Sequence, residues 1–114
     1  EMIYYAALLH DLGMVGISKE VVTAPRKLRP EELKHVRTHV EITEEKLIGK
    51  MDPEVLSIAL AHHERGDGNG YPMHLTDRKI TLQQGILQVG DAVSALLHRG
   101  VSGMLCRRIR WLVI

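Results

Sequence analysis

Two adjacent histidines, His62 and His63, stand directly before a glycine-rich segment, and three other parts of the chain carry His or Asp residues to match. Each neutral imidazole has a donor and an acceptor that need partners, so adjacent histidines are uncommon in an apolar core. Imidazole nitrogen and carboxylate oxygen together suit iron, manganese, zinc or nickel, whereas a calcium site uses oxygens alone. The groups that match this chemistry are His10, Asp11, His39, His62, His63 and Asp91.

These groups are too many for one tetrahedral ion and are about right for two ions that share a ligand. Consecutive helical side chains such as His10 and Asp11 diverge by roughly 100°. One ion bound by both therefore needs a helix end or a bridging carboxylate, which Asp11 can supply. Two ions roughly 3.5–4 Å apart can hold a bridging hydroxide and stabilise the attacking and leaving oxygens of a phosphoester. We therefore predict a dinuclear site with Asp11 as its bridging, catalytic carboxylate.

Helices must position these side chains, because no segment alternates apolar and polar residues over a useful length. Apolar spacing predicts a largely buried helix over residues 2–12, with His10 and Asp11 near its end. A glycine-punctuated loop over 13–17 follows, and Ser18 then caps a short turn, its hydroxyl accepting from a backbone N–H. The predicted class is all-α.

Three more helices are expected. Pro30 begins one that continues to Gly49, and Asp52 caps the next, which ends in His62-His63. Residues 64–79 form a long loop, and a last strong helix begins near Ile80. We expect the apolar pattern of these helices to turn the candidate ligands inward. The apolar face of the last helix comprises Leu82, Ile86, Val89, Val93 and Leu96.

Composition narrows the class of protein. The 114 residues suffice for one domain over 1–114, and the evenly mixed charges, with a formal net charge of +1, give no support for DNA or membrane binding. The single cysteine, Cys106, excludes an internal disulfide framework and a Cys-based zinc site. No apolar run approaches the roughly 20 residues that span a bilayer, and we expect a cytoplasmic location. The chain begins at Glu1 inside an expected helix, so we expect a fragment that is incomplete at its N-terminus.

Three segments, in order, resemble the signatures of the HD-GYP family, a branch of the HD metal-dependent phosphohydrolases. They are residues 6–13 around His10-Asp11, residues 62–72 from His62-His63-Glu64 to Gly70-Tyr71-Pro72, and residues 86–91 ending at Asp91. The similarity extends from about Met2 to about Leu97. It implies a helical bundle of HD type with a long loop before the last strong helix. It also implies two or three divalent ions, often iron or manganese, and the bacterial second messenger cyclic di-GMP as substrate.

The resemblance also implies roles for individual residues. Tyr71 would contact the nucleotide, with Gly70 and Arg99 on the same substrate side, unless Tyr71 only anchors the loop. Glu64 would either orient a metal ligand by contacting it or cap the helix end. Diguanylate cyclase or other signalling domains are candidate partners for the Gly-Tyr-Pro loop, and a homodimer is a candidate assembly. The implied metal ligands are His10, Asp11 (bridging), His39, His62, His63 and Asp91.

Several positions depart from the family pattern. The lysine that reaches the substrate phosphate is replaced by Met14, and a glycine four residues after the middle histidine is replaced by Thr43. Gly85 and Gly90 stand where the late helix has an arginine and an alanine, and the basic segment after Asp91 is reduced to Arg99. Each lost charge-assisted phosphate contact is worth roughly 1.5–3 kcal/mol.

These observations leave three hypotheses. The first is a phosphodiesterase that opens cyclic di-GMP by attack of a metal-bridging hydroxide on phosphorus. The second is a degenerate, non-catalytic domain that senses a cyclic dinucleotide or binds a protein, motivated by Met14 and residues 100–103. The third, a general HD nucleotidase, is disfavoured by the loop over 64–72. Taken alone, His10-Asp11 would more often be a satisfied pair than a ligand set.

Overall fold

The computed structural model describes residues 2–24 and 26–97. Within these ranges the β-type pairing is limited to one isolated bridge between Asp67 and Thr76. The all-α prediction is therefore confirmed. The elements are α1 (Met2–Leu9), the 3₁₀ helix η1 (Leu12–Gly16), α2 (Lys19–Val22), α3 (Pro30–Arg37), α4 (His39–Leu47), α5 (Pro53–Leu60) and α6 (Leu82–Leu97).

Local capping explains where two helices begin. Asp52 Oδ1 accepts a hydrogen bond from the Glu54 N–H at 2.8 Å, which confirms it as the N-cap of α5. At α3, proline follows Arg29, whose backbone N–H donates to the Glu32 carboxylate at 2.8 Å. The prediction for Ser18 is wrong, because its hydroxyl donates to Glu20 Oε2 at 2.7 Å and caps no backbone N–H.

Two predicted boundaries are also wrong. The helix over 2–12 ends at Leu9, and the expected loop over 13–17 is largely the 3₁₀ helix η1. The expected helix from Pro30 to Gly49 is divided at Thr38, whose hydroxyl donates to the His35 carbonyl. A threonine hydroxyl that bonds to a preceding carbonyl competes with the regular helix pattern. His39 consequently begins α4.

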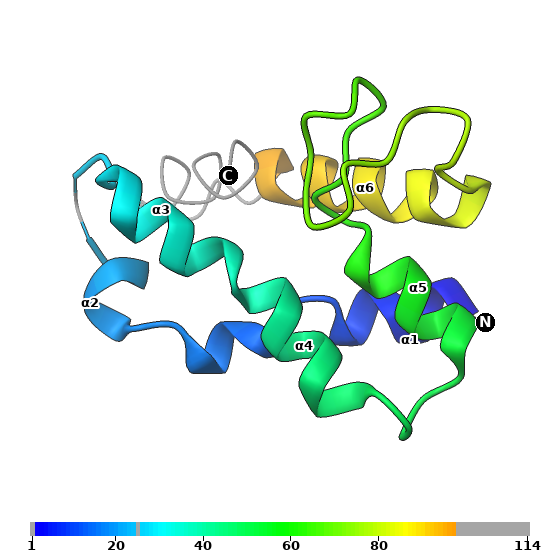
Figure 1. The fold of residues 1–114 in the computed structure, drawn as a ribbon, viewed down its shortest axis with the longest axis horizontal. Helices are drawn as coiled ribbons and strands as arrows, with labels where there is room; N and C mark the ends of the chain where they lie inside the picture. The colour runs from blue at the N-terminus through cyan, green and yellow to red at the C-terminus, as the bar shows by residue number, and fades with distance from the viewer. Residues whose placement is uncertain (1, 25, 98–114) are drawn as a thin grey trace.

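The helices meet around two buried apolar clusters. Figure 1 shows α3 and α4 crossing the molecule one after the other, with α1 and α5 side by side at one end. One cluster joins α1, α5 and α6, and the other joins the η1–α2 region to α3. The first consists of Ala6, Val55, Ile58, Ala59 and Leu87, and the second of Ile17, Ala24, Leu28 and Val36.

Helix α6 docks on α5 through glutamines. The Gln84 Nε2 donates to the Ser57 hydroxyl at 3.1 Å, and the Gln88 Nε2 donates to the Ala61 carbonyl at 2.9 Å. Carbonyls near a helix C-terminus lack partners within the helix, so these amides satisfy groups that apolar side chains would leave unpaired. The apolar face that we expected to direct α6 inward instead points outward, with Leu82 77% exposed and Val89 65% exposed.

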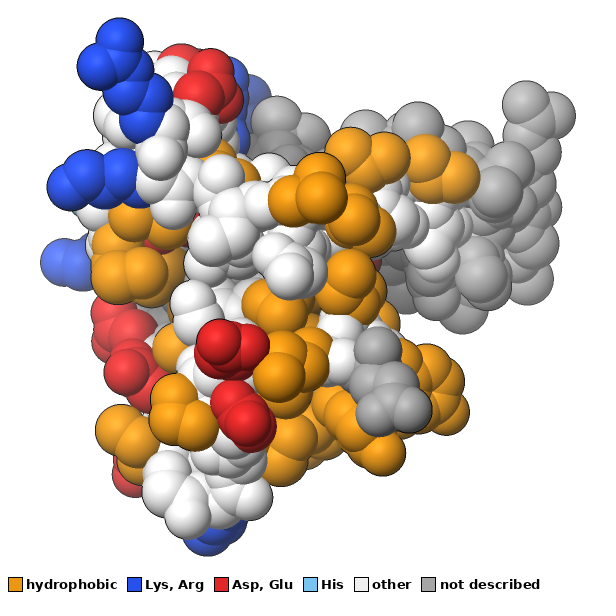
Figure 2. Space-filling view, turned by 90° about the vertical axis from the view of Figure 1, so that its right-hand side faces the viewer, with side chains coloured by type: hydrophobic (Ala, Val, Ile, Leu, Met, Phe, Trp, Pro, Cys, Tyr) orange, Lys and Arg blue, Asp and Glu red, His pale blue; other side chains and the backbone are white. Residues whose placement is uncertain are grey.

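Helix α1 also departs from its prediction. We expected it to be largely buried, but Ala6 is its only buried residue, and Tyr4 and Leu8 are 64% and 65% exposed. In the described part of the chain, α1 packs mainly against α5 and α6. Hydrophobic side chains therefore gather on the face shown in Figure 2. None of the described helices has the length and apolar character needed to cross a membrane.

Candidate metal centre

The predicted ligands converge on two groups that share Asp11. In the first, Asp11 meets His39, His62 and His63, and in the second it meets His10 and Asp91. In each group, one potential ligand atom per residue lies within 4.8 Å of all the others. Asp11 Oδ1 is 3.2 Å from His62 Nε2, while Asp11 Oδ2 is 3.2 Å from His10 Nε2. One carboxylate thus turns one oxygen to each group, which is the geometry of a bridge.

Asp11 owes its position to a close approach between η1 and α4. The backbone N–H of Gly13 donates to the hydroxyl of Thr43 at 2.8 Å, and that hydroxyl donates to the His39 carbonyl at 2.8 Å. A side chain at position 13 would overlap the His39 carbonyl oxygen, so glycine permits this packing. Thr43 is fully buried, with 0% exposure. The departure at Thr43 therefore ties the loop that carries Asp11 to the helix that carries His39.

Three histidines are held by the same backbone contact. The Nδ1 atoms of His10, His39 and His62 each lie 2.7 Å from the carbonyl oxygen three residues earlier. A carbonyl can only accept, so each Nδ1 carries the hydrogen. In a neutral ring this leaves a lone pair on Nε2, the atom that faces the cluster. Hydrogen-bonded orientation of this kind is the usual arrangement behind a metal-binding imidazole.

The Nε2 atoms that point into the site lack hydrogen-bond donors, and a cation could take the place of a donor. The His39 and His62 Nε2 atoms face each other at 3.2 Å in a buried site, and the His10 Nε2 faces Asp91 Oδ1 at 3.3 Å. Among the described residues the buried His10 Nε2 has no well-formed hydrogen bond. Acceptors that face acceptors in a buried site are unfavourable unless a proton or a cation lies between them. The donor set therefore fits divalent cations of the borderline class, iron or manganese included.

The same surroundings shift the ionisation of the cluster. Burial lowers the pKa of His39, and burial with the nearby His62 lowers the pKa of His63 to about 2. Although burial alone would lower the pKa of His10, the adjacent carboxylates of Asp11 and Asp91 raise it to about 10. Burial works against ionised Asp11, but His10 and His62 hold its pKa well below the usual range. His39 and His63 are thus neutral, whereas without a metal His10 carries an additional proton.

Tyr71 forms one wall of a cavity beside the cluster. Its ring stacks on His63, with centroids 5.0 Å apart and planes at 11°. The cavity has a volume of about 320 Å³, and its lining includes His62, His63 and Asp91 as well as Tyr71. The Tyr71 hydroxyl is buried without a hydrogen-bond partner among the described residues. Tyr71 also packs against the apolar cluster of α3, so it anchors the loop and faces the cavity at once.

Glu64 organises the loop over 64–79. Its carboxylate oxygens accept hydrogen bonds from the backbone N–H groups of Met73 at 2.6 Å and Leu75 at 2.9 Å. Gly70 packs so closely on the backbone of Glu64 and Arg65 that no larger residue would fit. The structure thus shows Glu64 holding the loop. Its support of a metal ligand, like the substrate role of Gly70, stays a prediction.

The other positions that depart from the family pattern lie in different parts of the structure. Met14 packs against the apolar cluster of α3 and is partly buried, so it belongs to the core. A Cβ at Gly85 or at Gly90 would meet open space in the described structure. Arg99 lies outside the described residues, as do 100–103. Sequence reasoning missed Thr43 as a positioning residue and Arg37, whose guanidinium lies over Tyr71 and lines the cavity. The hydrogen-bonding capacity of Thr43 was the available signal; Arg37 gave none.

A family model described as "HD domain" matches residues 1–107 of the chain. A curated protein named "Cyclic di-GMP phosphodiesterase" from Thermotoga maritima is 37% identical over 101 residues, covering 85% of this chain and 27% of the relative. The response regulator RpfG of Xanthomonas campestris pv. campestris, also named a cyclic di-GMP phosphodiesterase, is 39% identical over 99 residues, covering 84% of this chain and 26% of the relative.

A third relative carries a different substrate in its name. It is "3'3'-cGAMP-specific phosphodiesterase 3" of Vibrio cholerae, which is 38% identical over 93 residues and covers 80% of this chain and 20% of the relative. The chain thus spans about a quarter or less of the length of these curated relatives.

Proposed function

This chain belongs to the HD domain family, in the HD-GYP branch whose signature segments it carries, and from that premise we propose that it forms the catalytic site of a cyclic dinucleotide phosphodiesterase. The observation that carries the proposal is the position of Asp11 between two groups of ligand-type atoms. A mononuclear site would not need one carboxylate to turn an oxygen to each side. The relatives named as phosphodiesterases support the reaction class.

The proposed site divides the work between a set of three histidines, a pair of residues and the shared aspartate. His39, His62 and His63 would hold one divalent ion, His10 and Asp91 the other, and Asp11 both. When bound, such ions activate a water for attack on phosphorus and neutralise charge on the phosphate. In their neutral form, His10, His39 and His62 are kept as acceptors toward the site because backbone carbonyls occupy their Nδ1–H groups. Tyr71 would hold the nucleotide at the cavity wall.

We propose cyclic di-GMP as the substrate, on the strength of the names of two relatives at 37% and 39% identity. The relative named for 3'3'-cGAMP, at 38% identity, makes that dinucleotide the natural comparison. Iron and manganese are the proposed ions. A signalling partner at the loop over 64–79 and a homodimer remain predictions.

The proposal is tested on the full-length protein that contains this chain. After loading with Mn²⁺ or, without oxygen, Fe²⁺, the metal content is measured and conversion of cyclic di-GMP and 3'3'-cGAMP to linear products is followed. We expect two or more ions per chain and turnover of at least one dinucleotide. Asp11→Ala should lose metal from both groups, whereas Asp91→Ala should keep the ion of the first group, which contains His39, His62 and His63. The exposed His35, outside both groups, provides the control variant His35→Gln.

Two results would contradict the proposal in different ways. Binding of metal and dinucleotide without turnover would favour the non-catalytic sensor. Equal metal loss in Asp11→Ala and Asp91→Ala would contradict the division into two groups.

A further inference from the structure

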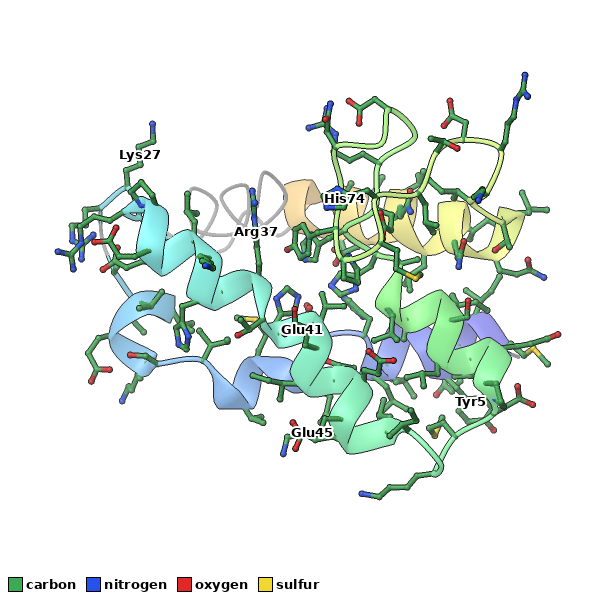
Figure 3. The ribbon with its side chains drawn as sticks, in the orientation of Figure 1. Tyr5, Lys27, Arg37, Glu41, Glu45 and His74 are labelled. Atoms are coloured by element: carbon green, nitrogen blue, oxygen red, sulfur yellow. The ribbon has the colours of Figure 1, made fainter. Side chains whose placement is uncertain are left out.

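Arg37 occupies an unusual place beside the candidate metal centre. Its guanidinium carbon lies 5.3 Å from the centroid of the Tyr71 ring. The Tyr71 ring in turn stacks on His63, which belongs to the candidate metal centre. Arg37 also lines the cavity that His62 and Asp91 line. Figure 3 shows Arg37 extending from the end of α3 toward the side of the molecule that carries His74 and its loop. A permanent positive charge thus lies at the cavity that the candidate ligands His62, His63 and Asp91 also line.

The charge of Arg37 has no acidic partner among the described residues, in contrast to Arg26, Arg29 and Arg65. Arg26 pairs with Glu32 at 2.7 Å. Arg65, which lines the same cavity, pairs with Asp67 at 2.9 Å. An arginine held on an aromatic ring keeps its N–H groups free at its edge, because the cation–π contact uses the face of the guanidinium. The guanidinium of Arg37 is therefore held at the cavity without an acidic partner among the described residues.

The neighbouring hydroxyl points to the same kind of ligand. The Tyr71 hydroxyl is buried and lacks a hydrogen-bond partner in the described structure, so it too is free to donate. A guanidinium fork and a phenol that line one cavity match the oxygens of a phosphodiester. Met14 is uncharged and packs against an apolar cluster, so it supplies no positive charge at this place.

We infer that Arg37 is a phosphate-binding residue: with its guanidinium over the Tyr71 ring and at the cavity, it binds a phosphate oxygen of the nucleotide and supplies a positive charge that Met14 does not. This inference rests on the proposed function. It extends that function by assigning the phosphate contact to the junction of α3 and α4, two residues before His39 in the chain.

The test separates phosphate binding from support of Tyr71. In the full-length, Mn²⁺-loaded protein, binding of cyclic di-GMP and of guanosine, which has no phosphate, is measured by calorimetry, with KM and kcat for the dinucleotide. Arg37→Met keeps a long stem on the Tyr71 ring and removes the charge, and Arg37→Lys keeps the charge without the fork. Lys34→Met, at an exposed position of α3, is the control for a lost surface charge.

We expect Arg37→Met to weaken cyclic di-GMP binding by roughly 10- to 100-fold, the usual range for charge-assisted hydrogen bonds. Guanosine binding and metal content should stay unchanged, KM should rise more than kcat falls, and Arg37→Lys should recover part of the loss. Equal weakening of guanosine binding, or a loss no larger than in Lys34→Met, would overturn the inference alone. A parent protein that binds no cyclic dinucleotide would overturn the proposed function and, with it, the inference.

Discussion

The Nε2 atoms of His39 and His62 lie 3.2 Å apart, although both rings donate their Nδ1–H to backbone carbonyls. Two neutral imidazoles held in this way place lone pair against lone pair inside the protein. Such an arrangement is stable when a proton or a metal ion lies between the acceptors. The backbone carbonyls of α3 and α5 therefore prepare the site for a cation before any cation binds.

Metal binding should release a proton from His10. The carboxylates of Asp11 and Asp91 raise its pKa to about 10, so the metal-free ring is charged at pH 7.5. An imidazole must be neutral to bind a metal ion, and we expect about one proton released per chain on Mn²⁺ binding. Calorimetry in buffers of different ionisation enthalpy measures this number. His10→Gln should abolish the release, while His74→Gln on the exposed loop should keep it. Heats that do not depend on the buffer would contradict the assignment.

The metal-free protein should lose stability as the pH falls from 7 to 5. The pKa values of His39 and His63 are lowered in the folded state, chiefly by burial, the latter to about 2. The unfolded chain therefore binds more protons below about pH 6.5, and each histidine contributes a slope of up to about 1.4 kcal/mol per pH unit. Urea unfolding at pH 7, 6 and 5 in the presence of a chelator measures the slope.

Other groups of the cluster do not produce this slope. The raised pKa of His10 gives stability that is fully present below pH 6.5 and is lost as the pH rises through about 10. The lowered pKa of Asp11 gives stability that is lost only below about pH 4. His63→Gln should accordingly flatten the profile between pH 7 and 5. An unchanged profile in this variant would contradict the assignment to His63.

Removing the Thr43 hydroxyl should loosen Asp11. Thr43→Val keeps the shape of the side chain but leaves the buried Gly13 N–H without its acceptor, at a cost of about 1–3 kcal/mol. Thr43→Ser keeps the hydroxyl and should retain most of the stability and of the Mn²⁺ affinity. Urea unfolding and metal titration compare the two. A loss of affinity in Thr43→Ser as large as that in Thr43→Val would contradict the assignment to the hydrogen bond, because Thr43→Ser lacks only the methyl group.

Glu64→Gln should free part of the loop over 64–79. An amide has a single acceptor oxygen, so the backbone N–H of either Met73 or Leu75 loses its partner. Hydrogen exchange at these two amides should become faster, and Glu44→Gln at an exposed position of α4 should leave it unchanged. The Mn²⁺ content distinguishes the two roles predicted for Glu64. It should be retained if the carboxylate only holds the loop, and should fall if it also supports a ligand.

Helical spacing and cap residues allowed much of the fold to be predicted. Asp52 and Pro30 begin helices as expected, because capping and proline preferences act within a few residues. The break at Thr38 and the 3₁₀ helix η1 were not predictable, because tertiary packing decides between nearly equal local conformations. The prediction that the apolar face of α6 points inward was wrong for a similar reason. Hydrogen bonds from Gln84 and Gln88 to α5 set its orientation, and hydrophobic periodicity does not report them.

The sequence alone determined which residues have the chemistry of metal ligands, and that they recur in an order typical of one family. It could not determine which ligand atoms meet. The division into two groups around Asp11 depends on the contact of Gly13 with Thr43 and His39, across some thirty positions of the chain. The placement of Arg37 over Tyr71 depends likewise on the folded loop. Residue type sets what a side chain can bind, whereas only tertiary packing sets which partners lie within reach.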